Sequence, residues 1–141
     1  MPSNTDRQQQ NWETTDLFTI IPPTALRDSD IESKQRNASA RGIVLIVKLS
    51  AEAGTAGFTP RILIKDEAGN SIIYWSAAAE LTANGTATYV LYPGAMAGAG
   101  AGVTANASIV LPREWILQLD YTTGTPATDS FTVAAYGYYL L

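Results

Sequence analysis

The side chains that could do chemistry in this chain are carboxylates, because it contains no histidine and no cysteine. The usual general base, the commonest metal ligand, the thiolate nucleophile and the disulfide are therefore missing. Asp66 and Glu67 form the one adjacent carboxylate pair, at a predicted turn. A divalent cation needs several converging oxygens at the spacing of a known loop. We therefore interpret this pair as part of a solvated turn.

Glu114 and Asp120 flank a strand in which Trp115 and its alternating partners define the buried face. Both carboxylates are then expected to point to solvent, which gives a catalytic pair little support. The glycine-rich stretch from Gly94 to Gly102 lacks the Lys-Ser/Thr and the following helix of a phosphate loop. The sequence thus predicts no catalytic, cofactor or metal site, and we expect a protein that is not an enzyme.

Charge and hydropathy also bear on partners and location. The net charge is −4 and the isoelectric point is near 4.6, which argues against nucleic acid, because phosphate binding needs clustered Lys and Arg. No apolar run approaches the ~20 residues that a membrane span needs. The first residues lack the regions of a signal peptide, so the sequons at Asn37, Asn84 and Asn106 carry no implication of a glycan. A role in turns fits two of these three placements. We expect synthesis in the cytoplasm and no membrane partner.

The amino-acid composition of the chain changes near Arg41. Residues 1–40 are polar, whereas the chain from Gly42 onward is rich in Ala, Gly, Thr and β-branched residues. Between Ser76 and Pro112 the one charged side chain is Glu80. This pattern predicts an extended N-terminal arm over residues 1–40 and a compact domain over residues 41–141.

The domain reads as a series of short strands with turns at roughly ten-residue spacing. Residues 42–49 are expected to be buried on both faces, and residues 58–65 and 72–75 to form a hairpin around 67–70. A second hairpin is predicted at the Asn84-Gly85 turn, and a long surface loop over the Ala/Gly-rich residues 95–108. Residues 115–121 and 130–141 complete an all-β, antiparallel β-sandwich, Ig-like or jelly-roll-like.

The arm contains apolar residues that its own composition cannot bury. Ordering it costs roughly 1–2 kcal/mol of backbone entropy per residue, so we expect it to bury them against a partner. Strand addition to a neighbour's sheet edge is the expected mode for Leu17–Ile21, a run that Pro22 and Pro23 stop. The aromatic C-terminal strand is either a last core strand or a subunit contact. The predicted protein-interface residues are Trp12, Leu17, Phe18, Ile20, Ile21, Leu26, Ile31, Tyr136 and Tyr138.

About a hundred residues of the domain resemble a family of small structural proteins from tailed bacteriophages and prophages. The resemblance rests on Ala40-Arg41-Gly42 at the start of a valine-rich strand, Tyr92-Pro93-Gly94, the Ala/Gly-rich loop, and Leu111-Pro112-Arg113 before Trp115. The motifs are turns and strand starts, and they mark no active site. The leader carries no part of the resemblance.

The resemblance implies a virion protein on the capsid exterior, made in the host cytoplasm. The expected role is capsid decoration, or cement, in which the arm and the sandwich stabilise contacts between copies of the major capsid protein. A homo-oligomer is expected, with a trimer favoured. Two alternatives stay open: a neck or tail component, such as a terminator or tube protein, and a carbohydrate- or host-binding module on a fibre. The second would need Trp12, Trp75 or Trp115 to stack on a sugar.

Overall fold

The computed structural model describes residues 15–26, 29–53, 57–82, 84–96, 98–100, 102–123 and 130–141. These residues form β-strands joined by turns, and they include no helix. The strands are β1 (Phe18–Leu26), β2 (Ile31–Arg36), β3 (Gly42–Ala53), β4 (Gly57–Lys65), β5 (Ser71–Ser76), β6 (Leu81–Thr82), β7 (Gly85–Leu91), β8 (Gly98–Gly100), β9 (Val103–Ala107), β10 (Glu114–Thr123) and β11 (Ser130–Leu140).

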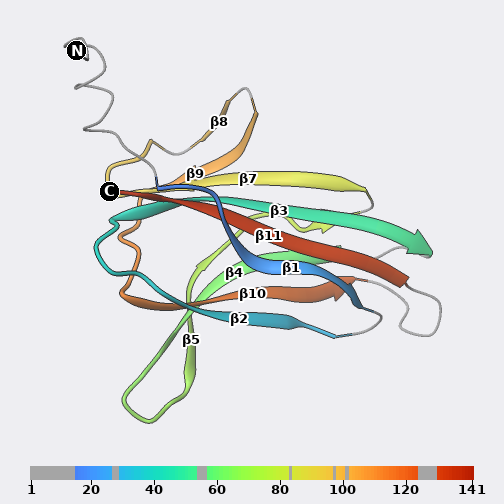
Figure 1. Cartoon of the computed structure of the whole chain (residues 1–141), viewed down its shortest axis with the longest axis horizontal. Coiled ribbons are helices and arrows are strands. Elements are labelled where there is room, and N and C mark those ends of the chain that lie inside the picture. The colour runs from blue at the N-terminus through green and yellow to red at the C-terminus, as the bar shows by residue number, and fades with distance from the viewer. Residues whose placement is uncertain are drawn as a thin grey trace.

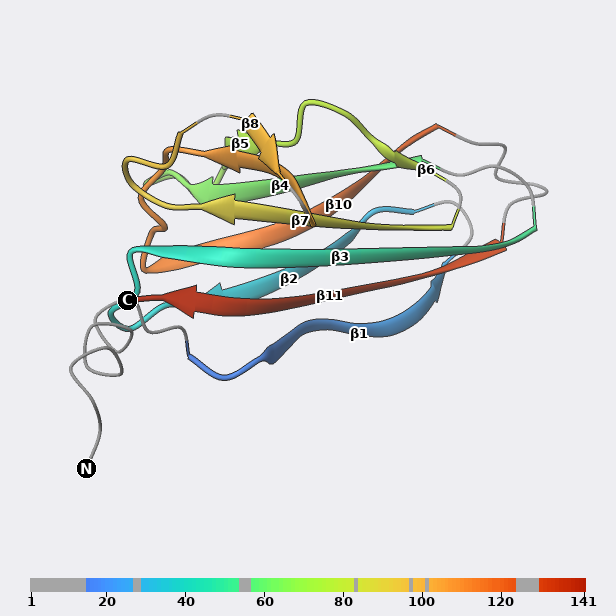
Figure 2. The same cartoon turned by 90° about the horizontal axis from the view of Figure 1, so that it is seen from above.

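Two sheets pack face to face (Figure 1). Sheet A has the strand order β1-β11-β3-β7-β9-β8, and sheet B has the order β2-β10-β4-β5, with β6 paired to β4. Neighbouring strands are antiparallel except for β7 and β9, which are parallel. Figure 2 shows β1 and β8 near opposite sides of the molecule. The all-β sandwich expected from the sequence is confirmed, while the finer Ig-like or jelly-roll-like kinship stays a prediction.

The core lies between the sheets and is built from alternate residues of the long strands. On β3 the inward set, Ile43, Leu45, Val47 and Leu49, is at most 2% exposed. On the outward face of β3, Val44 and Ile46 are half-buried and Lys48 and Ser50 are exposed, so the expectation that this strand is buried on both faces is wrong. On β10 the predicted alternation is confirmed, because Trp115, Leu117 and Leu119 are buried in the same cluster.

The predicted division at residue 41 does not separate the described residues, because β1 and β2 belong to the sandwich. β1 is the edge strand of sheet A and pairs with β11, and β2 is the edge strand of sheet B and pairs with β10. The hydroxyl of Ser33 donates to the backbone carbonyl of Ile20 at 2.8 Å and so joins the two edge strands. Ile20 and Ile21 of β1 are buried in the core of this same chain.

The two prolines of β1 do not end the strand, contrary to expectation. Ile21 pairs with Ala135 and Thr24 pairs with Val133, so Pro22 and Pro23 lie in a bulge between two paired positions. An edge strand tolerates proline because one side of it has no ladder bonds to lose.

The turn between β4 and β5 forms the predicted hairpin. Asp66 organises it, since its carboxylate accepts hydrogen bonds from the backbone NH groups of Ala68 (2.9 Å) and Asn70 (2.8 Å). Gly69 has φ 83°, a conformation that favours glycine.

Two other predicted connections are wrong. β6 pairs with β4 while β7 pairs with β3, so the Asn84-Gly85 turn crosses between sheets and closes no hairpin. The Ala/Gly-rich region is not a plain loop: β8 and β9 pair with each other, and β9 pairs with β7. Small side chains allow this close strand packing with little apolar burial.

Asn37 is a buried polar hub between β2 and β3, with 4% of its surface exposed. Its side chain donates to the carbonyl of Ala40 at 2.7 Å and accepts from the Ala40 NH at 2.7 Å. It also donates to the carbonyl of Leu111, at 3.3 Å, in the segment that leads into β10. The turn role predicted for this sequon residue is confirmed.

Candidate interaction surfaces

The predicted interface residues of the N-terminal segment differ in how far they are exposed to solvent. Ile20 and Ile21 are 4% and 2% exposed within this chain's own core, so their assignment to an intermolecular interface is wrong for the single chain. Leu17, at 51% exposed, stays open to a partner. The remaining described members, Phe18, Leu26 and Ile31, are half-buried against the core. Trp12 lies outside the described residues.

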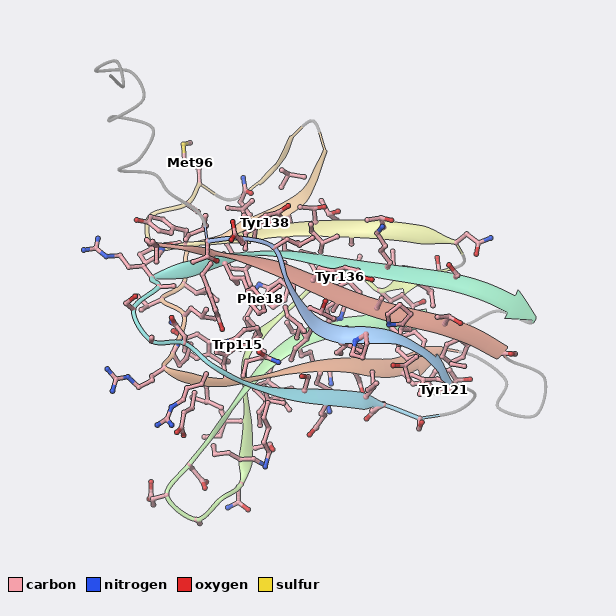
Figure 3. All side chains as sticks on the ribbon, viewed as in Figure 1. Phe18, Met96, Trp115, Tyr121, Tyr136 and Tyr138 are labelled. Carbon is pink, nitrogen blue, oxygen red and sulfur yellow. The ribbon has the colours of Figure 1, made fainter. Side chains whose placement is uncertain are left out.

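Phe18 shows how the segment is held. Its ring stacks on Tyr139 with centroids 4.6 Å apart. The backbone NH of Thr15 donates to the carbonyl of Tyr139 at 3.0 Å, and the NH of Tyr139 donates to the Thr15 hydroxyl at 3.0 Å. The start of the described chain is therefore tied to the C-terminal strand (Figure 3).

Tyr136 and Tyr138 lie on the outer face of sheet A, between the inward-facing and buried residues of β11. Tyr138 pairs with Val44, which pairs with Val90, and Tyr136 pairs with Ile46. Paired residues of neighbouring strands lie on the same face, so these five half-buried side chains form one surface, which we call the tyrosine face.

The tyrosine face carries little charge. The sequences of β7 and β11 contain no charged residue. The Lys48 ammonium of β3 lies 6.0 Å from the centroid of the Tyr136 ring, within the range of a cation–π contact.

An apolar hollow of about 260 Å³ adjoins this face, lined by Val90, Tyr92, Ala95, Leu140 and Leu141. The neighbouring position on β3, between the ends of β7 and β11, is Gly42. A Cβ at Gly42 would collide with the Leu91 carbonyl and would lie 2.9 Å from Tyr92 Cα. The face thus combines aromatic side chains with a concave apolar end.

A second surface lies on β5, the second strand of the predicted hairpin. Ile72, Ile73 and Tyr74 are 45%, 54% and 37% exposed. The β4–β5 hairpin projects from sheet B on the side away from sheet A (Figure 1). The Tyr74 hydroxyl donates to the carbonyl of Val110 at 2.6 Å, and Val110 is itself 56% exposed.

The other sheet edges carry features that oppose pairing with another chain. β1 has two prolines and two bulges, β2 alternates charged side chains along an exposed face, and β8 is only three residues long. β5 has a bulge where Tyr74 is inserted, yet its sequence contains neither a charged residue nor a proline. It is the least protected edge.

A groove of about 610 Å³ lies beside the hairpin on sheet B. Its apolar floor includes Leu63 and Ile116, which are 3% and 4% exposed. Lys34 and Arg36 line it from β2, and Lys65 lines it from β4. Glu114 also lines it and forms an ion pair with Arg36 at 3.5 Å. The complete lining is Lys34, Gln35, Arg36, Leu63, Ile64, Lys65, Pro112, Glu114, Trp115 and Ile116.

Among the carboxylates, the structure assembles a cluster that the sequence did not indicate. Asp120 forms an ion pair with Arg61 at 2.8 Å. Burial raises the pKa of Asp120, the negative charge of Asp30 raises it further, and Arg61 opposes both effects. Asp30 also accepts a hydrogen bond from the Tyr121 NH at 2.8 Å. The cluster ties the segment before β2 to β10 and β4, and we interpret it as structural.

The carboxylate of Asp66, by contrast, accepts its hydrogen bonds from residues of its own turn. Hydrogen bonding from the Asn70 NH, together with the side chain of Asn70 and the NH groups of Ala68 and Gly69, lowers the pKa of Asp66. Within the described ranges, no group of three or more Asp and Glu side chains is arranged to hold a metal ion. The described part of the chain also contains no helix long and apolar enough to cross a membrane.

The two tryptophans among the described residues, Trp75 and Trp115, offer little open surface. Trp115 is 1% exposed between the sheets (Figure 3). Trp75 is half-buried and packs against Tyr89 with centroids 5.1 Å apart and planes at 69°. Trp115 cannot stack on a sugar without unfolding its surroundings, so this observation counts against the carbohydrate-binding alternative.

Comparison with protein families, with curated proteins and with solved structures found no match to this chain.

Proposed function

We propose that this chain is a non-enzymatic structural protein that docks onto a larger protein assembly through the tyrosine face and its apolar hollow. The observation that carries the proposal is the composition of this face, in which two tyrosines and three aliphatic residues share one surface with a single lysine beside it. Contiguous apolar patches are uncommon on monomers and typically mark contacts with partners.

Tyrosine suits such a contact because it combines a large apolar area with a hydroxyl group. The hollow beside Leu140 and Leu141 could receive one apolar side chain of the partner, which is how central contacts of interfaces are commonly built. The strands behind the face are paired on both sides, so docking requires little ordering of the backbone.

The setting that we propose is the exterior of a tailed-phage head, with the major capsid protein as the partner. The support for this setting is the sequence resemblance over the domain. In this role the chain acts as a decoration protein, and burial of the tyrosine face across neighbouring capsid subunits strengthens the shell.

The test is binding of the purified chain to expanded, undecorated heads of the phage that encodes it, measured by co-sedimentation. Replacing both Tyr136 and Tyr138 by alanine should weaken binding at least tenfold, which corresponds to about 1.4 kcal/mol. The matched control is Val110→Ala, which truncates an exposed apolar side chain near sheet B and should bind like the wild type.

Two results would overturn the proposal. Failure of the wild type to bind heads at saturating concentration would remove the decoration role. Equal weakening by Val110→Ala would show that the effect is not specific to the tyrosine face. A sixfold ring of the chain in solution or on neck or tail structures would favour the neck or tail alternative.

A further inference from the structure

We propose that the outer side of sheet B is a contact between two copies of this chain, in which the β4–β5 hairpin of each copy lies in the groove of the other. This goes beyond the proposed function, because it concerns a surface on the opposite sheet and needs no capsid protein. Three properties of the surface support it: apolar exposure, charge and the relative position of hairpin and groove.

The hairpin exposes more apolar surface than a free edge strand normally keeps. Ile72 and Ile73 are about half exposed, at 45% and 54%, and a two-stranded hairpin that extends into water is only marginally stable by itself. The groove has an apolar floor at Leu63 and Ile116. Docking one hairpin into one groove would remove Ile72 and Ile73 from water and place them against this floor.

The charges of the two surfaces are complementary. Glu67 is exposed at the tip of the hairpin, while Lys34, Arg36 and Lys65 line the groove. Each copy carries a net charge of −4, so two copies repel each other unless opposite charges meet at their contact. The groove's one carboxylate, that of Glu114, is paired with Arg36 at 3.5 Å, so the groove's excess positive charge comes from Lys34 and Lys65.

The position of the surfaces favours a twofold axis. The hairpin and the groove lie side by side and share Lys65, the last residue of β4. When a projection and its complementary groove adjoin, two copies related by a twofold axis can fill both grooves at once and close the assembly. The trimer expected from the sequence resemblance would instead need a head-to-tail contact.

The test measures mass by sedimentation over about 1 μM to 1 mM, a range that covers weak and moderate dissociation constants. The wild type should form a dimer. Lys34→Glu and Glu67→Lys should each raise the dissociation constant at least tenfold, because like charges then face each other. The chain that carries both substitutions should dimerise again with near wild-type affinity, since the pair is restored with reversed sign.

The matched control is Lys48→Glu, which makes the same charge change on the outer face of sheet A and should leave the dimer unaffected. Thermal unfolding of every variant shows whether the chain is still folded, so that a monomeric mass is not mistaken for the result of unfolding. A wild type that stays monomeric at 1 mM, or that forms trimers, would overturn the inference. Failure of the double substitution to restore the dimer, or an equal effect of Lys48→Glu, would also overturn it.

Discussion

The Ile21→Ala substitution tests whether β1 is part of this chain's own core. Ile21 is 2% exposed and belongs to the central cluster. The change removes three carbon atoms, worth about 0.8 kcal/mol each when buried, or about 2.4 kcal/mol in transfer free energy. The cavity left behind adds to this, so the expected loss in unfolding free energy is about 2.5–4 kcal/mol. This is a large share of the about 5–15 kcal/mol that stabilises a typical domain.

Urea unfolding followed by tryptophan fluorescence measures the loss, with buried Trp115 as a reporter. Leu17→Ala is the matched control from the same apolar run; Leu17 is 51% exposed, so its truncation should change stability by less than about 0.5 kcal/mol. An unchanged midpoint for Ile21→Ala would refute the packing of β1.

Three further predictions concern the polar contacts and one glycine. Asn37→Ala should destabilise the fold by about 3 kcal/mol, because it leaves buried backbone groups such as the Leu111 carbonyl without their partner; unchanged urea unfolding would contradict this. Burial and the charge of Asp30 raise the pKa of Asp120, so stability attributable to this group falls as pH rises through that pKa. Asp30→Asn should lower the pKa of Asp120 in an NMR titration, and an unshifted titration would contradict the proposed coupling. Gly42→Ala should cost about 1–3 kcal/mol through overpacking, and a wild-type thermal midpoint would contradict the close approach found at this position.

Where local pattern determines structure, the sequence was sufficient. The alternation from Trp115 to Leu119 predicts the buried face of β10, because successive side chains of a strand point to opposite faces. The turn at Asp66–Asn70 was also predictable, since Asp accepts hydrogen bonds from nearby backbone NH groups and Gly69 supplies the positive φ.

The sequence did not predict which strands, far apart in the chain, pair with each other in the sheets. Phe18 pairs with Gly137, and nothing in the sequence around either residue specifies the other. The polar composition of residues 1–40 therefore suggested an arm, although Ile20 and Ile21 are buried by strands that lie far away in the chain. The Ala/Gly-rich β8 and β9 were missed because small side chains give no alternation to detect.

Surface exposure was the other property that sequence did not provide. Residues 72–75 have the composition of a core strand, yet Ile72 and Ile73 face solvent because β5 is a sheet edge that extends beyond the sandwich. Tyr136 and Tyr138 were recognised as candidates because they share one face of their strand. Val44 and Ile46 could be assigned to the tyrosine face only from the structure, because the register between β3 and β11 pairs them with Tyr138 and Tyr136.

The most direct test of the proposed function is an image of expanded heads decorated with this chain, at a resolution that identifies the strands of the sandwich. We predict density on the head exterior in which the outer face of sheet A, with Tyr136, Tyr138 and the hollow beside Leu141, is buried against capsid subunits. Heads that stay bare at saturating concentration, or bound sandwiches whose tyrosine face points to solvent, would contradict the account.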